Sequence, residues 1–328
     1  MNESDYSGRN VLITGGAGFI GSTLAIRLCQ MGATVTVVDS MVPEYGGNIV
    51  NLAECRERIR FNISDVRDSH SMRYLIKGQD YLFNMAGQTS HMDSMSDPFT
   101  DLEINSRSQL SILDACRKYN TSIKVVFAST RQIYGRPQYL PVDEKHLLHP
   151  VDVNGINKMC GESYHILFHD VYGIRTCALR LTNTYGARMR VQDARQTFVG
   201  IWIRLILENK PFEVWGGGQL RDFNHVDDVV AAMLAAGTCD QANGLVFNLG
   251  GHEIVSLKQL ADMLVDVNGG GEYRIREFPE ERKKIDIGDF YADYSKFEQT
   301  SGWKPSIGLR EGLSSTLAFY RQQLSEYI

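Results

Sequence analysis

A glycine-rich turn, set between an apolar run and a helical pattern, constrains the fold of this chain more than any other feature. Residues 15–21 read GGAGFIG and follow directly on the apolar run at 11–14. Over residues 19–30, apolar side chains then recur at the spacing of one helix face. A second β-rich run follows at 33–39. The opening of the chain therefore predicts strand, turn, helix and strand, which is the start of a parallel α/β sheet.

The alternation of β-rich and helical segments continues to about residue 181. Further β-rich runs lie at 59–63, 81–85, 124–128 and 176–181, with helical patterns between them at 69–76, 102–118 and 157–171. Such alternation predicts an α/β protein with a doubly wound parallel sheet, the Rossmann architecture. We expect this sheet to form a first domain over residues 1–181.

The second half of the chain follows a different pattern. An arginine-rich loop leads to a helical pattern at 197–208 and a glycine turn at 216–218, followed by a helix at 227–236, a strand at 246–249 and a last helix at 308–327. A chain of 328 residues also exceeds the size at which a single core usually keeps growing. We expect a smaller α+β substrate-binding lobe over residues 182–328, whose chain can return to the first domain.

Composition and charge exclude several classes of protein. The chain is 43% hydrophobic with a formal charge of −5 and no basic run, so we expect no nucleic-acid partner. No apolar run approaches the roughly eighteen residues that suggest a membrane span, and the polar residues 1–10 do not form a signal peptide. The six cysteines are scattered without a C-x-x-C pair, which favours reduced thiols over disulfides or a zinc site. We expect a cytoplasmic protein that binds no metal and no membrane.

The glycine turn also predicts a nucleotide site. Gly15, Gly18 and Gly21 permit a tight turn, close approach of a pyrophosphate and close helix–strand packing. The start of the following helix then presents free N–H groups to the phosphates. Asp39 ends the second strand 18 residues after Gly21, where its carboxylate would accept hydrogen bonds from ribose hydroxyls and repel a 2′-phosphate. We therefore expect NAD rather than NADP, with Asp65 near the adenine.

Motifs along most of the chain strengthen this expectation. They are TGGAGFIG at 14–21, SDV at 64–66, NMAG at 84–87, STRQIYG at 129–135, RLTNTYG at 180–186 and LRDFNHV at 220–226. In this order they resemble the extended short-chain dehydrogenases/reductases, and most of all the NAD-dependent nucleotide-sugar epimerase/dehydratase family. The resemblance implies further cofactor contacts from Phe19, Ile20, Val66 and Ala86. It also implies a homodimer built from the two helices at 102–118 and 157–171.

One residue departs from the pattern of that family. Its members oxidise a sugar hydroxyl while a tyrosine takes the hydroxyl proton, and a lysine four residues later contacts the nicotinamide ribose. By position, Thr130 matches the family's hydroxyl partner and Lys158 its lysine, but Asn154 stands in place of the tyrosine. An asparagine amide has no proton to lose near neutral pH, so Asn154 can orient a hydroxyl or a water but cannot act as the base.

Four residues are candidates to supply the missing base. His91 follows a segment that resembles the family's substrate-facing loop, and the ordinary pKa of histidine, near 6.5, suits proton transfer. Lys158, beside a positively charged nicotinamide, could have its pKa lowered toward neutrality. Cys160 is expected to point away along the helix, and Tyr134 to pack beneath the nucleotide loop. The sequence does not choose among the four.

The sequence favours one reaction of the family over another. In the family's 4,6-dehydratases an aspartate–glutamate pair protonates the departing hydroxyl and removes the C5 proton, and here Arg131 and Gln132 occupy those places. Neither side chain can do this at neutral pH. We therefore expect an NAD-dependent epimerase that acts on a nucleoside diphosphate sugar through a transient keto sugar. An oxidoreductase or dehydratase acting on the same substrates is one alternative, and a catalytically silent NAD-binding protein is another.

The resemblance also implies where the nucleotide sugar lies. Asn183 matches the family's asparagine that binds a phosphate or a sugar hydroxyl, and Arg221 matches the arginine that holds the diphosphate. Arg282, in a run of three basic residues, would add a second diphosphate contact, and Gln88 on the substrate-facing loop would contact the substrate. Three arginines of an intervening loop could recognise an acidic or polar sugar substituent or simply be exposed: Arg188, Arg190 and Arg195.

Overall fold

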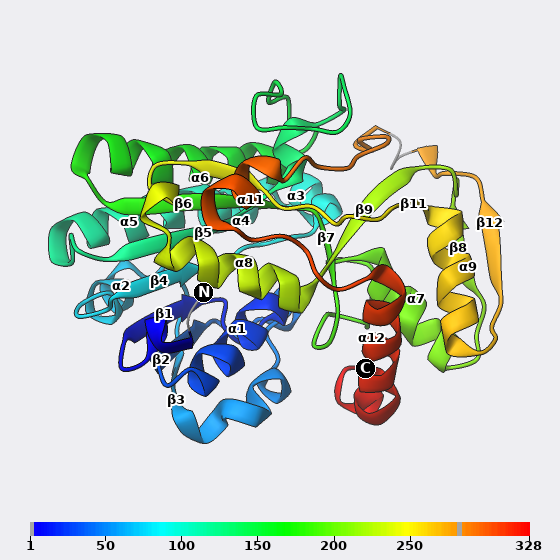
Figure 1. Ribbon diagram of the computed structural model, residues 1–328, viewed down its shortest axis with the longest axis horizontal. Helices are drawn as coiled ribbons and strands as arrows, with labels where there is room; N and C mark the ends of the chain where they lie inside the picture. Colours follow the sequence, from blue (N-terminus) through cyan, green and yellow to red (C-terminus); the bar gives the residue numbers. More distant parts are fainter. Residues whose placement is uncertain (1–2, 281–283) are drawn as a thin grey trace.

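The computed structural model describes residues 3–280 and 284–328, and a parallel sheet forms the centre of its larger lobe (Figure 1). The sheet has seven strands in the order β10-β6-β5-β4-β1-β2-β3. Their bounds are β1 Asn10–Thr14, β2 Thr34–Asp39, β3 Ile59–Ile63, β4 Tyr81–Asn84, β5 Lys124–Thr130, β6 Arg175–Leu181 and β10 Val246–Asn248. Every pairing between neighbours in this sheet is parallel. The predicted doubly wound sheet is confirmed.

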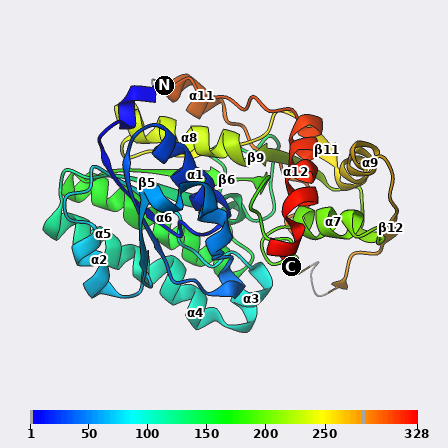
Figure 2. The ribbon, with the colours of Figure 1, turned by 90° about the horizontal axis from the view of Figure 1, so that it is seen from below.

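Helices cover both faces of this sheet, which explains why apolar residues fill the middle of its central strands. In β1, Val11 and Ile13 pack on one face and Leu12 on the other. The first face is covered by α1 (Phe19–Gln30), α8 (Val226–Thr238) and α11 (Ser295–Ser301), and the second by α2 (Ser69–Leu75), α5 (Ser108–Tyr119) and α6 (Val153–Tyr172). Figure 2 shows the two layers from below.

The strand order places the glycine turn at the natural binding crevice of such a sheet. The chain first runs outward from β1 to β3 and then crosses to β4 on the other side of β1. Ligands of doubly wound sheets bind outside the carboxyl ends of the strands at this point of reversal. Thr14, the last residue of β1, pairs with Val38 of β2 and with Asn84 of β4. The turn that follows Thr14 therefore opens directly into the crevice.

A smaller lobe with its own core lies beside the large sheet, on the right in Figure 1. It contains a three-stranded sheet of β7 (Asn183–Tyr185), β9 (Leu220–His225) and β11 (Ile254–Ser256). It also contains a pair of strands, β8 (Phe212–Trp215) and β12 (Tyr273–Arg276). Three helices complete its core: α7 (Phe198–Leu207), α9 (Leu257–Asn268) and α12 (Leu309–Gln323).

The chain crosses between the two lobes several times. After β9 it forms α8, which packs on α1, and then β10, which pairs with β6 at the edge of the large sheet. It leaves for the small lobe to form α9 and β12, returns as α11 beside β10, and ends with α12 in the small lobe. Segments that follow residue 181 therefore contribute to both lobes.

The helices around α6 differ in part from those expected. α6 begins at Val153 rather than at 157, because the Asp152 carboxylate caps it and accepts a hydrogen bond from Gly155 N at 2.6 Å. The expected helix at 102–118 is divided into a π-helical turn, Glu103–Arg107, and α5. The short helices α3 (His91–Ser96) and α4 (Pro98–Leu102) were not expected, because so few residues show no apolar period.

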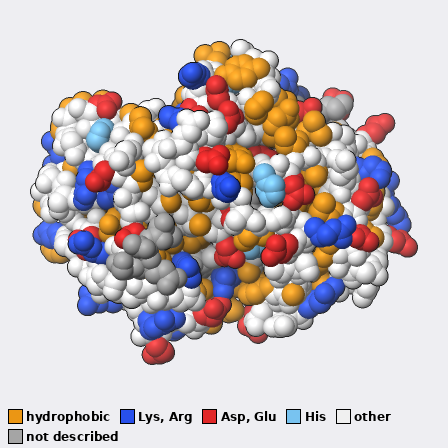
Figure 3. Space-filling view, in the orientation of Figure 1, with side chains coloured by type: hydrophobic (Ala, Val, Ile, Leu, Met, Phe, Trp, Pro, Cys, Tyr) orange, Lys and Arg blue, Asp and Glu red, His pale blue; other side chains and the backbone are white. Residues whose placement is uncertain are grey.

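The surface is ordinary in charge. On the face shown in Figure 3, Lys and Arg side chains are intermingled with Asp and Glu. All six cysteines are unpaired. Across the described residues, none of the helices combines the length and the apolar character needed to cross a membrane.

Candidate active site

A cavity of about 1100 Å³ opens at the carboxyl ends of β1, β2, β4 and β5 and extends to the small lobe. It contains most of the side chains that the sequence singles out. The predicted site residues that line it are Gly15, Gly18, Phe19, Ile20, Gly21, Asp39, Asp65, Val66, Ala86, His91, Thr130, Asn154, Lys158, Asn183 and Arg221. Residues separated by up to two hundred positions in the sequence thus face one space.

The glycine turn leaves room for a ligand against the start of α1. Gly15 has a positive φ of +65°, and a Cβ there would lie 2.9 Å from the backbone of Ala86. A Cβ on Gly21 would lie 2.3 Å from Gly15 O, so close packing leaves no room for a side chain at this position. A Cβ on Gly18 would approach only Gly15 O, at 3.2 Å, and otherwise meets open space. Gly18 therefore faces the cavity, and no side chain caps α1 there, so its first N–H groups can receive a pyrophosphate.

Asp39 stands at the end of β2 on the wall of the cavity. Its Oδ2 accepts a hydrogen bond from Ala17 N at 3.0 Å, and its Oδ1 accepts one from Met41 N at 2.9 Å. Burial raises the pKa of Asp39, although these two bonds oppose the shift. Each carboxylate oxygen keeps a further lone pair for a ribose hydroxyl. Together with the glycine turn, this carboxylate fits an adenine dinucleotide that carries no 2′-phosphate.

Lys158 lies deep in the cavity wall on α6. Its Nζ donates a hydrogen bond to Ala128 O at 3.1 Å, near the carboxyl end of β5. Burial lowers the pKa of Lys158 to about 8, although the nearby Asp101 carboxylate opposes the shift. A Cβ on Gly87 would lie 2.8 Å from Nζ, so glycine at 87 makes room for the ammonium group. Thr130, at the end of β5, lines the same space and accepts a hydrogen bond from Gln132 N at 3.2 Å.

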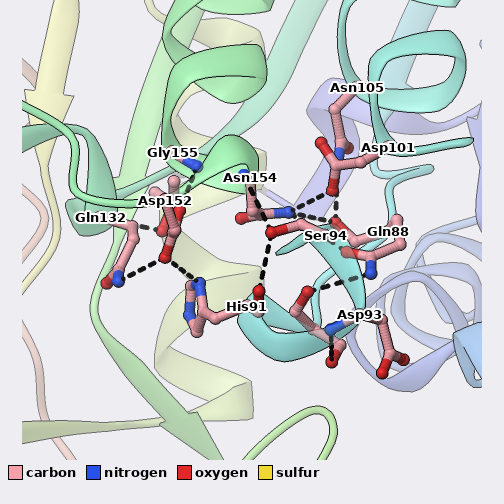
Figure 4. Close-up of polar contacts among 12 residues, drawn as sticks. Gln88, His91, Asp93, Ser94, Asp101, Asn105, Gln132, Asp152, Asn154 and Gly155 are labelled. Atoms are coloured by element: carbon pink, nitrogen blue, oxygen red, sulfur yellow. Dashed lines mark hydrogen bonds and ion pairs between the residues drawn. The ribbon is translucent and has the colours of Figure 1, made fainter. Parts of the chain in front are cut away.

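Asn154 is almost fully buried, and its amide nitrogen is tied into a polar cluster behind the cavity (Figure 4). Nδ2 donates to Gln88 O at 2.8 Å and to Asp101 Oδ2 at 3.0 Å. The Asp101 carboxylate also accepts bonds from Asn105 Nδ2 at 3.0 Å and Asn157 Nδ2 at 2.8 Å. In Figure 4 the amide oxygen of Asn154 points away from this cluster. The part of the Asn154 side chain that points away from the cluster is therefore a hydrogen-bond acceptor and not a proton donor.

The structure differs from the sequence-based prediction for Gln88. Its side chain is buried, does not line the cavity, and donates from Nε2 to Ser90 O at 3.0 Å. Because Gln88 also accepts from Asn154, it supports the wall instead of facing a substrate. Its place after a strand end suggested exposure, but the turn into α3 folds the side chain inward. Arg282, another predicted substrate contact, lies outside the described residues.

His91 begins α3 and faces the cavity beside Asp152. Its Nδ1 lies 2.9 Å from Asp152 Oδ2, and the histidine side chain is 39% exposed while the aspartate side chain is 0% exposed. Gln132 Nε2 donates to the same oxygen at 2.9 Å. Burial alone would raise the pKa of Asp152, but His91 and the hydrogen bonds to Gly155 and Gln132 hold it below its usual value.

Sequence reasoning missed the pairing of Asp152 with His91. Asp152 carried a local signal, because an aspartate before a helical pattern is a preferred N-cap. That signal predicts that one oxygen of the Asp152 carboxylate has a structural role, but it predicts no partner for the other oxygen. His91 lies 61 positions earlier in the chain (152 − 91), so only the folded structure brings the two together.

The other two candidates for the missing base lie away from the cavity. Tyr134 is fully buried, where it donates from its hydroxyl to Asn248 Oδ1 at 2.7 Å and accepts from Arg180. Burial raises the pKa of Tyr134 well above its ordinary value. Cys160 Sγ lies 3.1 Å from Ser106 Oγ on the far side of α6. His91 and Lys158 are thus the two candidates that line the cavity.

The small-lobe end of the cavity carries two arginines. Arg221 is buried on β9, where Nη1 donates to Leu220 O at 2.9 Å and to Gly288 O. Arg131 donates from Nη2 to Asn183 Oδ1 at 2.9 Å, and its guanidinium lies over the Phe290 ring. Burial lowers the pKa of Arg131 to about 10, still far above neutrality. Arg131 therefore remains a cation beside Asn183.

The three loop arginines are engaged in ion pairs. Arg190 forms a pair with Asp193 at 2.7 Å, and Arg195 lies 3.6 Å from Asp93. Arg188 pairs with Glu54. Of the three, Arg195 lines the cavity.

Comparison with known proteins agrees with this geometry. Residues 11–250 match the family model described as the NAD dependent epimerase/dehydratase family. A protein of Methanocaldococcus jannaschii named "Putative UDP-glucose 4-epimerase" is 35% identical over 92% of this chain and 95% of its own length. The dTDP-glucose 4,6-dehydratase of Streptomyces griseus is 30% identical over 96% of this chain and 95% of its own.

A solved structure extends the likeness to three dimensions. The crystal structure of UDP-glucose 4-epimerase from Thermotoga maritima, determined with UDP-glucose, superimposes with a TM-score of 0.88. It is 30% identical to this chain, and the superposition covers 96% of this chain and 99% of that one. With the glycine turn, Asp39 and Lys158 placed on one cavity, these matches show that the chain belongs to the NAD dependent epimerase/dehydratase family.

Proposed function

We propose that this protein is an NAD-dependent epimerase of a nucleoside diphosphate sugar. One observation supports this most strongly: a single cavity joins the glycine turn and Asp39 to Lys158, and continues to Asn183 and Arg221. The first part suits a dinucleotide and the last part a sugar diphosphate. When bound, NAD⁺ supplies a hydride acceptor whose reduced form returns the hydride, so that epimerisation needs no net oxidant.

The residues of this chain would position the substrate between the two ends. Arg221 provides a buried guanidinium fork that suits a diphosphate, with Asn183 beside it. Thr130 and the amide oxygen of Asn154 would accept or orient the hydroxyl of the reacting carbon. Lys158 would hold the nicotinamide ribose at the end of β5. The small lobe would close over the sugar and exclude water.

Epimerisation is favoured over dehydration by the side chains after Thr130. Removal of water from a sugar needs an acid for the departing hydroxyl and a base for the neighbouring carbon. Arg131 keeps its proton, because its pKa stays near 10, and its Nη2 is bonded to Asn183. Gln132 carries no titratable proton, and its amide is bonded to Asp152. A keto sugar formed here would sooner be reduced again than lose water.

The test is turnover of a panel of UDP-, dTDP-, GDP- and CDP-sugars by the purified protein. We expect two epimers to interconvert with no lasting change in absorbance at 340 nm and no loss of water by mass. A lasting change at 340 nm indicates an oxidoreductase, and loss of water a dehydratase. Activity abolished in Lys158→Ala would exclude the catalytically silent alternative, whereas no turnover of any sugar would contradict the proposal.

We also propose that two copies associate through α5 and α6. The outer face of these helices exposes a set of large apolar side chains, from 39% to 60% exposed: Leu110, Ile156, Leu167, Val171 and Tyr172. Apolar residues exposed along adjoining helices commonly mark an interface. Helices that adjoin in this way can pack as a four-helix bundle across a twofold axis.

A reducing, cytoplasmic setting is our proposal for where the protein works. All six thiols are unpaired, and four of them are buried. Proteins of oxidising compartments more often use such residues in disulfides.

A further inference from the structure

We propose that His91, oriented by Asp152, takes the proton of the sugar hydroxyl in place of the tyrosine that Asn154 replaces. This inference rests on the proposed function, because it names the proton acceptor of that reaction. His91 would be the catalytic residue, since it faces the cavity, and Asp152 would be a positioning residue behind it.

The first support is the geometry of the pair. Nδ1 of His91 is buried and lies 2.9 Å from Asp152 Oδ2. His91 lines the cavity, and 39% of its side chain is exposed. A carboxylate beside Nδ1 favours the tautomer with its proton on Nδ1, and this leaves the lone pair on Nε2. The N–H is not aligned with Oδ2 here, which is common before a substrate binds.

The second support is that the carboxylate is fixed. Asp152 Oδ1 accepts from Gly155 N at 2.6 Å as the cap of α6, and Oδ2 accepts from Gln132 Nε2 at 2.9 Å. The side chain is fully buried. A carboxylate held on both oxygens can hold an imidazole in one orientation and can stabilise the imidazolium that forms after proton transfer.

The third support is that the same network holds the backbone of His91 next to Asn154. Ser94 Oγ donates to His91 O at 2.7 Å and accepts from Asn154 N at 3.2 Å (Figure 4). The first turn of α3 is therefore joined to the first turn of α6. The start of α3, where His91 lies, is thus held beside residue 154.

The charged groups around His91 lie on α6, on α3 and on the loop that carries Arg195. Asp152 lies at the start of α6, Lys158 lies deeper on the same helix, and Asp93 on α3 is 3.6 Å from the Arg195 guanidinium. Asp93 is thus paired with a cation, and Lys158 donates to Ala128 O. Among these groups, Asp152 is the carboxylate in contact with the imidazole.

The proton step balances without any further reactant. The O–H bond of the sugar hydroxyl breaks, its electron pair becomes the second bond of the keto group, and the proton moves to Nε2 of His91. The hydride of the same carbon goes to the oxidised dinucleotide of the proposed function. On return of the hydride, Nε2–H gives the proton back to the carbonyl oxygen and His91 is neutral again.

The experiment measures epimerisation by wild-type protein, His91→Ala and Asp152→Asn. We expect His91→Ala to lose about 10²–10⁴-fold in kcat, with NAD⁺ affinity unchanged, and to regain activity when imidazole is added. Asparagine is also a good N-cap, so Asp152→Asn keeps the start of α6 while it removes the charge. We expect it to lower kcat at least tenfold, with KM changed less than about threefold. His70→Ala, an exposed histidine at the start of α2, is the control and should behave as wild type with or without imidazole.

The outcomes separate this inference from the function on which it rests. If the turnover of His91→Ala stays within about threefold of wild type, the proposed role of His91 is wrong, while the proposed function stands. A large loss in His91→Ala that imidazole does not reverse, together with lost NAD⁺ affinity, would also overturn it, because the residue would then be structural. No wild-type turnover of any sugar would overturn the proposed function, and this inference with it.

Discussion

At position 154 an amide side chain helps to satisfy a buried carboxylate. Asp101 is fully buried and accepts hydrogen bonds from Asn154, Asn105 and Asn157. A buried carboxylate is costly unless its oxygens are bonded. Asn154 therefore has a structural reason to be present, besides any role in orienting a substrate.

Asn154→Tyr tests whether this position is separable from the cofactor site. We expect NAD⁺ affinity within about threefold of wild type, because Gly18 and Asp39 lie at the other end of the cavity. We expect stability to fall by about 1–3 kcal/mol, because Asp101 loses one of its three amide donors. Calorimetric titration with NAD⁺ and urea unfolding measure the two effects. A folded variant with no affinity for NAD⁺ would contradict our placement of residue 154.

Lys158 makes a pH prediction that can be checked without any substrate. Its pKa is about 8 in the folded protein and near 10.5 in the unfolded chain. Between these values the unfolded chain binds more protons, so the stability contributed by this residue rises with pH. The contribution of Lys158 to stability is complete above about pH 10.5 and is lost as pH falls toward 8. We expect wild type to gain up to about 3 kcal/mol over Lys158→Met between pH 8 and pH 10.

Lys124 is a second buried lysine on which the same effect can be measured, because burial lowers its pKa as well. Its Nζ donates to Asn243 Oδ1 and, at 3.3 Å, to Cys239 O. Lys124→Met should lower stability because it leaves two acceptors without their donor, and its pH dependence should have the same sign as that of Lys158→Met. If the Lys158→Met curve stays parallel to wild type from pH 8 to 10, the lowered pKa of Lys158 is wrong.

At the scale of elements, the sequence predicted the strands better than the starts of helices. Strands such as β1 and β2 are buried on both faces, so they read as short runs of apolar and β-branched residues. The start of α6 depends instead on one capping carboxylate, Asp152, which also contacts His91 from a distant segment. A local pattern cannot show such a long-range contact. That is why the residues around the glycine turn could be predicted to face one cavity, whereas the contact between Asp152 and His91 could not be predicted.

The packing of α6 on β5 predicts loss of stability in acid. His165 of α6 is fully buried against the Phe127 ring, and its Nδ1 lies 2.7 Å from Gly161 O. Burial lowers the pKa of His165 to about 4, against about 6.5 in the unfolded chain. As pH falls from 6.5 to 4 the unfolded chain takes up the proton first, so the folded state loses stability.

Urea unfolding of His165→Gln from pH 7 to pH 4.5 measures this effect. We expect wild type to lose about 2–3 kcal/mol more than the variant over that range. His70→Gln, at an exposed position, should follow the wild-type curve. Equal pH dependence in wild type and His165→Gln would mean that folding does not lower the pKa of this histidine.

At the scale of the whole molecule, the sequence indicated two lobes but not the path between them. β10 is three residues long, and its pairing with β6 across more than sixty positions depends on α8 packing on α1. Short strands and packing between distant helices leave little local pattern. The motifs nevertheless predicted the end of the cavity in the small lobe, because Asn183 and Arg221 lie at strand positions that face it.

The exposed faces of α5 and α6 predict the oligomeric state. Leu167→Glu combined with Val171→Glu places two charges on the proposed interface, where they cannot be desolvated at low cost. We expect sedimentation equilibrium to give a dimer for wild type and a monomer for this variant. Ile63→Glu, at a more exposed apolar position on β3, is the control and should remain a dimer. A wild-type monomer at micromolar concentration would refute the interface.

The most direct test of the account is a calorimetric titration of the purified protein, freed of bound nucleotide, with NAD⁺ and with NADP⁺. The account predicts one NAD⁺ per chain and much weaker binding of NADP⁺, because the Asp39 carboxylate repels a 2′-phosphate. It also predicts that Gly18→Val abolishes binding while the protein stays folded, since the added side chain fills the space at the start of α1. Wild-type protein with no affinity for NAD⁺ or NADH would contradict the account.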